Sequence, residues 1–163
     1  MIFIDTEFSS LSDPRLISVA AVTEDGRRFY AATDDVPMSV CSPFVREQVL
    51  PRLDLGRADV VGSHATVARA FSTWLLELGR DVDGRTLLVD DECDRELVTR
   101  LLQGARIPRV AMPTCLLIPM AGTTMVATFE AVFITHPERL RHNALDDALA
   151  FRHAVLGSGV TRA

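Results

Sequence analysis

The stretch MIFIDTEF, residues 1–8, decides the fold, because it is a run of apolar, β-prone residues that ends in two acids. Such a run is typical of a strand that is buried on both faces in the middle of a sheet. Side chains alternate along a strand, so Asp5 and Glu7 are expected on the same face, one pleat apart. There their oxygens can converge on one cation; the plain alternative is a pair of solvated charges at a strand end.

Two more strand-like runs follow directly. Residues 15–23 (RLISVAAVT) and 27–32 (RRFYAA) are joined at Asp25-Gly26, a dipeptide that favours a β-hairpin turn. The chain is therefore predicted to begin with three consecutive antiparallel strands.

Beyond residue 41 the spacing of the apolar residues changes to one that predicts amphipathic helices, which are separated by short strands. Ser42 is a candidate helix cap with Pro43 at the first helical position, and Gly79 and Gly104 are candidate helix ends. Residues 54–64 are interpreted as a polar connector. The predicted helices cover residues 42–53, 66–79, 91–104, 123–136 and 143–155, and the predicted strands lie at 84–90 and within the Pro-rich segment 107–122.

These elements predict an α/β protein with a mixed five-stranded sheet, three antiparallel strands followed by alternating helices and strands, and helices on both faces. With 163 residues, 48% of them hydrophobic, the chain is long enough for one domain over residues 1–163. No run approaches the roughly 18 apolar residues of a membrane span. The three cysteines lack disulfide or metal spacing. We expect a cytoplasmic protein without a membrane partner.

The net charge of -5 argues against a protein that holds long nucleic acid mainly by neutralising phosphates, because that mode needs a basic surface. A short nucleic-acid end or a small substrate remains compatible with this charge.

A further acid lies on the predicted helix 91–104. The apolar stripe of that helix includes Leu97 and Val98, and stepping back three or four positions reaches Asp94, whose carboxylate is thus expected to point toward the sheet. A buried carboxylate must be solvated, paired or metal-bound. The alternative, that an acid only complements the positive end of the helix, is left open for Asp94 and is preferred for Asp90, Asp91 and Glu92.

The stretch RHNALDDALA, residues 141–150, starts the last predicted helix. Asn143 is a good helix cap, and Asp146 stands where an acid would reach back to it. Helix initiation does not explain Asp147, which lies about 100° further round the helix than Asp146. His142 lies just outside the first turn, so His142 and Asp147 can approach one site.

Together these residues resemble the DEDDh group of 3′-to-5′ exonucleases, which have a ribonuclease-H-like fold. The matching features are an Asp-x-Glu on the first strand, a middle Asp on a helix and a final His-x4-Asp within HNALDDA. The short length, the opening FIDTEF and the segment VREQVLPRL are most similar to the small mycobacterial-type exoribonuclease family. The chain departs from the family at Asp90 and Cys93, where an Asn or Gly and an aromatic residue are usual.

The resemblance implies a metal-dependent exoribonuclease that removes nucleoside 5′-monophosphates from RNA 3′ ends, and it suggests a homodimer. Two divalent ions, Mg²⁺ or Mn²⁺, would be held by the four acids, with His142 as the general base. The implied catalytic set is Asp5, Glu7, Asp94, His142 and Asp147.

Three neighbours are candidate substrate contacts. Phe8 and Leu11 follow the Asp-x-Glu and can contact the terminal base or sugar, although Phe8 equally fits packing against the sheet. Arg141, with Arg139, is a candidate for phosphate contact, and the alternative is a solvated basic turn. Two other functions stay open: a 3′-to-5′ DNA exonuclease, and a non-catalytic nucleic-acid-binding protein with the same fold. Segment 107–122 either closes the site, forms a dimer interface or packs on the sheet.

Overall fold

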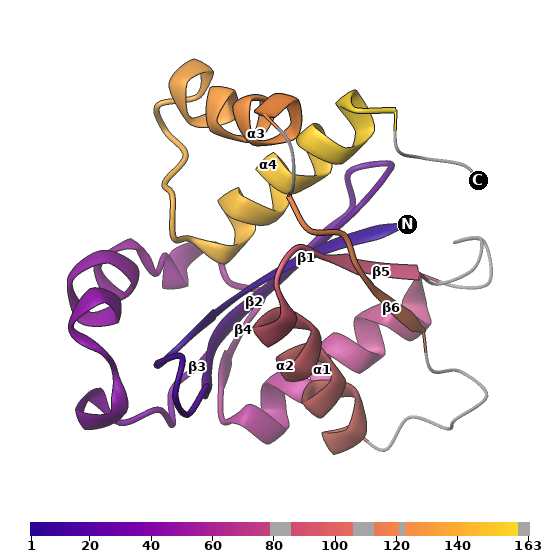
Figure 1. Cartoon of the computed structure of the whole chain (residues 1–163). Coiled ribbons are helices and arrows are strands. Elements are labelled where there is room, and N and C mark those ends of the chain that lie inside the picture. Colours follow the sequence, from indigo (N-terminus) through magenta and orange to yellow (C-terminus); the bar gives the residue numbers. More distant parts are fainter. Residues whose placement is uncertain (79–85, 106–112, 121–122, 160–163) are drawn as a thin grey trace.

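The computed structural model describes residues 1–78, 86–105, 113–120 and 123–159, and its strands form one mixed sheet (Figure 1). Within these ranges the sheet has six strands in the order β4-β3-β2-β1-β5-β6. The strands are β1 (Ile2–Phe8), β2 (Leu16–Thr23), β3 (Arg28–Thr33), β4 (Val60–Gly62), β5 (Thr86–Val89) and β6 (Thr114–Leu117). The helices are α1 (His64–Glu77), α2 (Glu92–Gly104), α3 (Thr123–Thr135) and α4 (Ala144–Gly157).

The predicted antiparallel meander is confirmed. β1 pairs with β2 and β2 with β3, both antiparallel, while β5 and β6 run parallel to β1. The hairpin turns at Asp25 and Gly26, where the Gly26 amide donates to the Thr23 carbonyl at 3.0 Å and Gly26 has a φ of 89°. Glycine adopts this left-handed conformation without steric cost, which fixes the turn.

The central position of β1 follows from its alternating side chains. Ile2 and Ile4 belong to the core formed with α1 and α2, whereas Phe3 belongs to the core formed with α3 and α4. On that second face the Phe3 ring meets Phe151 of α4 edge to face at 5.9 Å. Helices therefore cover both faces, and Figure 1 shows β1 between α4 on one side and α1 and α2 on the other.

The prediction of five strands is wrong, because the segment interpreted as a connector contains a sixth. β4 pairs in parallel with β3 at the edge of the sheet, from Ala31–Val60 to Thr33–Gly62. Three residues are too few to show a strand period, so only the partner strand identifies β4.

The predicted helix 42–53 is not a continuous α-helix. Ser42 does cap its first turn by accepting from the Val45 amide at 3.2 Å. The chain then forms a wide turn at Val45–Val49 and a tight 3₁₀ turn at Leu50–Arg52. Pro51 lacks a backbone amide and cannot continue the α-helical hydrogen bonding, which explains the change.

The other helices agree with the predictions to within a few residues at their ends. Gly79, the expected end of α1, lies outside the described residues, as do residues 107–112 and 121–122 of the Pro-rich segment. The described part of that segment contains β6, which confirms a short strand there. None of the helices in the described ranges is long and apolar enough to cross a membrane.

Candidate metal centre and active site

The acids predicted from the sequence meet at the end of β1. Oxygen atoms of Asp5, Asp90 and Asp94 lie within 4.8 Å of one another, which is close enough for one cation to bind all three. Ligand atoms of Glu7, His142 and Asp147 form a second such group within the same 4.8 Å limit. The structure therefore brings together all five residues of the predicted catalytic set and adds Asp90.

Asp5 has a buried carboxylate oxygen, Oδ2, without a hydrogen-bond donor among the described residues. An unpaired carboxylate oxygen away from water costs several kcal/mol, on the order of a lost charge-assisted hydrogen bond or more. A divalent ion with oxygen ligands would satisfy this atom, so the acids present fit Mg²⁺ or Mn²⁺.

Asp94 points inward from the first turn of α2, as the helical stripe predicted. Its side chain is 3% exposed, and its Oδ1 accepts hydrogen bonds from the Thr6 amide at 3.2 Å and from the Thr6 hydroxyl. Thr6 lies between Asp5 and Glu7 on β1 and points to the opposite face of the sheet. β1 therefore carries two acids on one face and, through Thr6, holds Asp94 on the other. The alternative, that Asp94 only complements the positive end of α2, does not account for these hydrogen bonds from Thr6.

The sequence interpretation missed Asp90. The acid that caps α2 is Asp91, whose side chain accepts from the Cys93 amide at 2.7 Å, and Glu92 pairs with Arg95 at the surface. Asp90 follows β5 directly, and β5 pairs in parallel with β1 through Phe3 and Leu88. Two residues beyond that pair, Asp90 stands beside Asp5. An acid directly after a buried strand next to β1 is a signal that could have identified it.

The first turn of α4 holds the second group in place. Asn143 is the predicted cap, accepting from the amides of Leu145 and Asp146 at 3.2 and 3.4 Å. The expected return of Asp146 to Asn143 is wrong: Asp146 accepts from the Leu140 amide at 3.1 Å and forms a two-pronged ion pair with Arg57 at 2.7 and 3.0 Å. Arg57 lies 89 residues away, so helix position alone could not identify this partner.

Asp147 fixes the backbone of the candidate base. It accepts from the His142 amide at 2.8 Å and from the Arg141 guanidinium at 2.9 Å. His142 has a φ of 63°, the left-handed region that non-glycine residues rarely adopt and that costs about 1 kcal/mol or more. The bond to Asp147 compensates for this strain and aims His142 at the site.

Phe44 is a further neighbour of the site that sequence reasoning missed. Its ring meets the His142 ring edge-on, with the centroids 5.0 Å apart, while 52% of Phe44 remains exposed. Only the tertiary structure brings these two residues together, so no local pattern could have revealed the contact.

Burial and mutual repulsion make the acids hard to ionise without cations. Burial, followed by the charges of Asp147 and Asp94, raises the pKa of Glu7 to about 8 and that of Asp5 well above its usual range. Burial also raises the pKa of Asp94 to about 8 and that of Asp147 to about 6, although Arg141 opposes the shift at Asp147. Bound divalent cations would reverse these shifts.

The pKa of His142 shifts in the opposite direction from the pKa values of the acids. Burial, and then the nearby charges of Arg141 and Arg52, lower the pKa of His142 below its usual 6.5. The neutral imidazole that a general base requires is therefore the stable form at neutral pH.

The three predicted substrate contacts lie in different surroundings. Phe8 is half-buried and packs against the core beneath α1 and α2, which agrees with the packing alternative. Leu11 is 81% exposed in the loop after β1. Arg141 pairs with Asp147, lies 3.6 Å from Glu130 and covers the rings of Phe129 and Phe133. Its guanidinium is thus engaged with the site itself.

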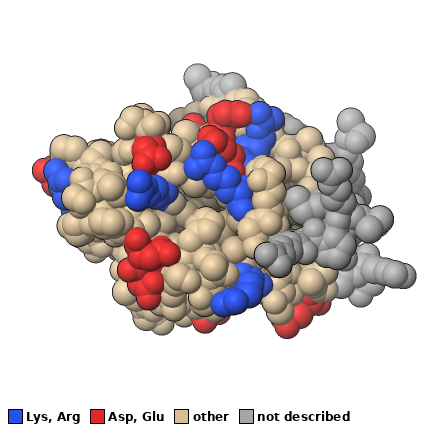
Figure 2. Space-filling model, turned by 90° about the horizontal axis from the view of Figure 1, so that it is seen from below, with Lys and Arg blue, Asp and Glu red and all other residues tan. Residues whose placement is uncertain are grey.

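One face of the molecule carries the mixed charges expected from a net charge of -5. Figure 2 shows basic and acidic side chains interspersed on one face of the molecule, without a continuous basic area among the residues drawn in colour.

Comparisons of the sequence with protein-family models and with curated proteins gave no match.

Proposed function

We propose that this protein is a metal-dependent 3′-to-5′ exoribonuclease. The observation that carries the proposal is the convergence of four acids and His142 at the end of β1, with one buried Asp5 oxygen that no described group satisfies. A purely structural acid cluster would be neutralised by protein cations. Among the described residues, Arg141 is the one cation within ion-pair distance of these four acids.

The sheet supports the same proposal. An antiparallel meander whose first strand continues into parallel strands, with helices on both faces, is the arrangement expected of a ribonuclease-H-like fold. In that arrangement β1 is central and carries the Asp-x-Glu, as it does in this chain.

Hydrolysis of a phosphodiester needs a positioned water and relief of charge on the phosphate and on the leaving 3′ oxygen. Two divalent ions would supply the Lewis acidity that activates the water and neutralises this charge. Asp5, Glu7, Asp94 and Asp147 would hold the ions, with Asp90 as an added ligand. Without ions the acids would repel the phosphate, so the same residues create both the metal site and the substrate site.

His142 would take the proton from the attacking water. Its strained backbone and its contact with Phe44 orient the ring, and its lowered pKa keeps a nitrogen free to accept. The exposed part of the Phe44 ring offers a face on which a terminal base can stack without sequence readout. Release of a nucleoside 5′-monophosphate follows from attack at the last phosphate.

The proposal is tested by incubating the purified protein with 5′-labelled RNA and DNA of one sequence, with Mg²⁺, Mn²⁺ or EDTA. We expect RNA to shorten one nucleotide at a time from its 3′ end, with EDTA and His142→Ala each abolishing the reaction. His64→Ala is the matched control, since His64 begins α1 after the edge strand β4 and belongs to neither group of ligand atoms, and it should retain activity.

Other outcomes identify the alternatives. Faster shortening of DNA would indicate a DNA exonuclease. Strand binding without degradation under any metal would indicate a binding protein. Calorimetry gives an independent check, because Asp5→Ala should lose Mn²⁺ binding, and unchanged binding would contradict the metal site.

A further inference from the structure

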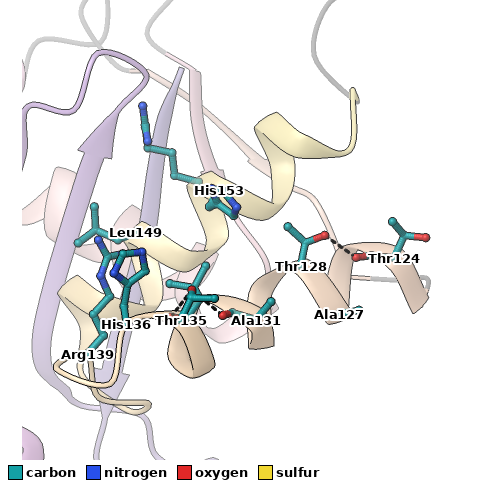
Figure 3. Close-up of a pocket in the computed structure, with 11 residues that line it drawn as sticks. Thr124, Ala127, Thr128, Ala131, Thr135, His136, Arg139, Leu149 and His153 are labelled. Carbon is teal, nitrogen blue, oxygen red and sulfur yellow. Dashed lines mark hydrogen bonds between the residues drawn. The ribbon is translucent and has the colours of Figure 1, made fainter.

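The turn between α3 and α4 carries His142, and apolar packing fixes little of it. In its first part, His136 and Arg139 line a groove of about 740 Å³ between the two helices (Figure 3). None of the described lining residues of this groove supplies a ligand atom to either acid group. Leu140, the next residue of the turn, is 44% exposed. The part of the turn next to the site is therefore held mainly by hydrogen bonds.

Two carboxylates in the first turn of α4 accept these hydrogen bonds. Asp147 accepts from the His142 amide at 2.8 Å, and Asp146 accepts from the Leu140 amide at 3.1 Å. Asp147 belongs to the second group of ligand atoms, so a bound ion would share its oxygens, whereas Asp146 belongs to neither group. Asp146 is therefore the anchor of the turn that metal binding leaves unchanged.

Arg57 holds the Asp146 carboxylate from outside the helix. Its two terminal nitrogens donate to the two Asp146 oxygens at 2.7 and 3.0 Å. Asp146 is only 1% exposed, so water cannot take the place of the guanidinium. The oxygen that accepts from the Leu140 amide, Oδ2, also accepts from Arg57. A buried carboxylate is strongly unfavourable without its cation, so the position of this oxygen depends on Arg57.

Arg57 is itself fixed to the sheet. It ends a 3₁₀ turn at Leu55–Arg57, where its amide donates to the Asp54 carbonyl at 3.2 Å. Two residues further on, Asp59 exchanges two hydrogen bonds with the backbone of Tyr30 in β3, at 2.8 and 2.9 Å. A chain of contacts therefore links the turn between α3 and α4 to the sheet that carries the acids of β1.

We propose that Arg57 and Asp146 are positioning residues for His142, the base of the proposed hydrolysis. This inference rests on the proposed function. The pair acts through the Leu140 amide, two residues before His142, whose φ of 63° lies in the left-handed region. Without this anchor the turn can relax toward an ordinary conformation and move the imidazole. A general base must lie within hydrogen-bond reach of its water, and a displacement of about 1 Å can cost about a hundredfold in rate.

The test measures kcat, KM and Mn²⁺ affinity in a double variant, Arg57→Met with Asp146→Leu. Both charges are removed together, so no unpaired charge is buried and the variant should fold. Its kcat for RNA at saturating Mn²⁺ should fall about tenfold or more, while KM and the calorimetric Mn²⁺ affinity stay within about twofold of the wild type. Arg27→Ala is the matched control, because it removes an arginine paired with Asp25 in the β2–β3 hairpin and should change none of the three.

Rescue by a free cation gives a second measurement, in the variant Arg57→Ala. The Arg57 side chain is 35% exposed, so its removal opens a path from solvent to Asp146. Guanidinium chloride at a non-denaturing concentration should restore kcat several-fold, and NaCl at the same concentration should not, because only guanidinium reproduces the two-pronged pair. A loss of kcat through general loosening of the fold would not respond to this one ion.

Hydrogen exchange of the Leu140 amide in EDTA measures the anchor without turnover. We expect exchange about tenfold faster in the double variant than in the wild type, and no change in Arg27→Ala. Unchanged exchange in the double variant would overturn the inference.

The kinetic outcomes separate this inference from the proposed function. If the wild type hydrolyses RNA and the double variant keeps its kcat, the inference is overturned and the nuclease stands. A double variant whose KM and Mn²⁺ affinity change as much as its kcat would show a structural role only, which also overturns the inference. If the wild type itself does not hydrolyse RNA, the proposed function fails and the positioning role fails with it, a result seen before any variant is compared.

Discussion

Asp94→Asn distinguishes a metal ligand from a structural acid, because the two amino acids have the same shape. The amide oxygen of the new side chain can still accept the hydrogen bonds from Thr6, so packing is retained. What changes is the charge next to Asp5 and Asp90. We expect the variant to be more stable than the wild type without metal at alkaline pH, and to lose the stabilisation by Mn²⁺.

The size of the expected gain in stability follows from the pKa of Asp94. Burial raises it from 3.8 to about 8, with Asp90 and Asp91 adding to the shift and Thr6 opposing it. About four pKa units correspond to roughly 5 kcal/mol. A neighbouring carboxyl can keep a proton when Asp94 ionises, so we expect a gain on the order of 2 kcal/mol, or about 4–8 °C in Tm.

The stability difference between the wild type and Asp94→Asn depends on pH. In the unfolded chain Asp94 ionises above its ordinary pKa of 3.8, whereas in the folded protein it ionises only near 8. The wild type therefore loses stability relative to the variant as pH rises through this window, and the two should be alike below it.

Thermal melts in EDTA and in Mn²⁺, at about pH 5, near the start of this window, and at about pH 9, above its end, measure the effect. Glu92→Gln is the matched control, because it removes an exposed charge from the same helix turn and should shift Tm by no more than about 1 °C. A lower Tm of Asp94→Asn at alkaline pH in EDTA, or an undiminished rise with Mn²⁺, would refute the reasoning.

Three further results are expected at the site. The acid limb of the rate profile at saturating metal should have its midpoint below pH 6.5, because burial lowers the pKa of His142; loss of that limb in His142→Ala would assign it. Thr6→Val should weaken Mn²⁺ binding about tenfold in calorimetry, because it removes the hydroxyl hydrogen bond that helps to hold Asp94, and Thr6→Ser should retain the affinity; equal affinities would contradict this positioning role. Phe44→Ala should raise KM for RNA about tenfold, whereas Phe44→Tyr keeps the ring and should not; an unchanged KM in both would exclude stacking.

Those parts of the fold that depend on local patterns could be predicted. A continuous apolar run identified β1, Asp25-Gly26 identified the hairpin, and Asn143 identified the start of α4, since each signal lies within a few residues. β4 could not be predicted in the same way, because a three-residue edge strand is defined by its pairing with β3.

The residues of the site likewise fall into those that local patterns predict and those that only the tertiary structure identifies. Asp5 and Glu7 were predictable from strand alternation, and Asp94 from helical periodicity. Asp90 requires the register between β1 and β5, and the true role of Asp146 requires Arg57. Arg141 was a candidate for phosphate contact, with a solvated basic turn as the alternative, and its partners Asp147 and Glu130 come from two different helices. Contacts between separate elements decide each of these cases.

The acid cluster has far more acidic groups than cations to neutralise them. Arg141 is the single cation that the described residues bring to the acid cluster, and it contacts only Asp147 among the proposed ligands. Phe129 and Phe133 lie against its guanidinium, and Glu130 lies 3.6 Å away, so it is held at the rim. The inner acids, Asp5 among them, must then carry protons or cations. Proton release, rather than movement of Arg141, is therefore the main cost of loading the inner site with metal near neutral pH.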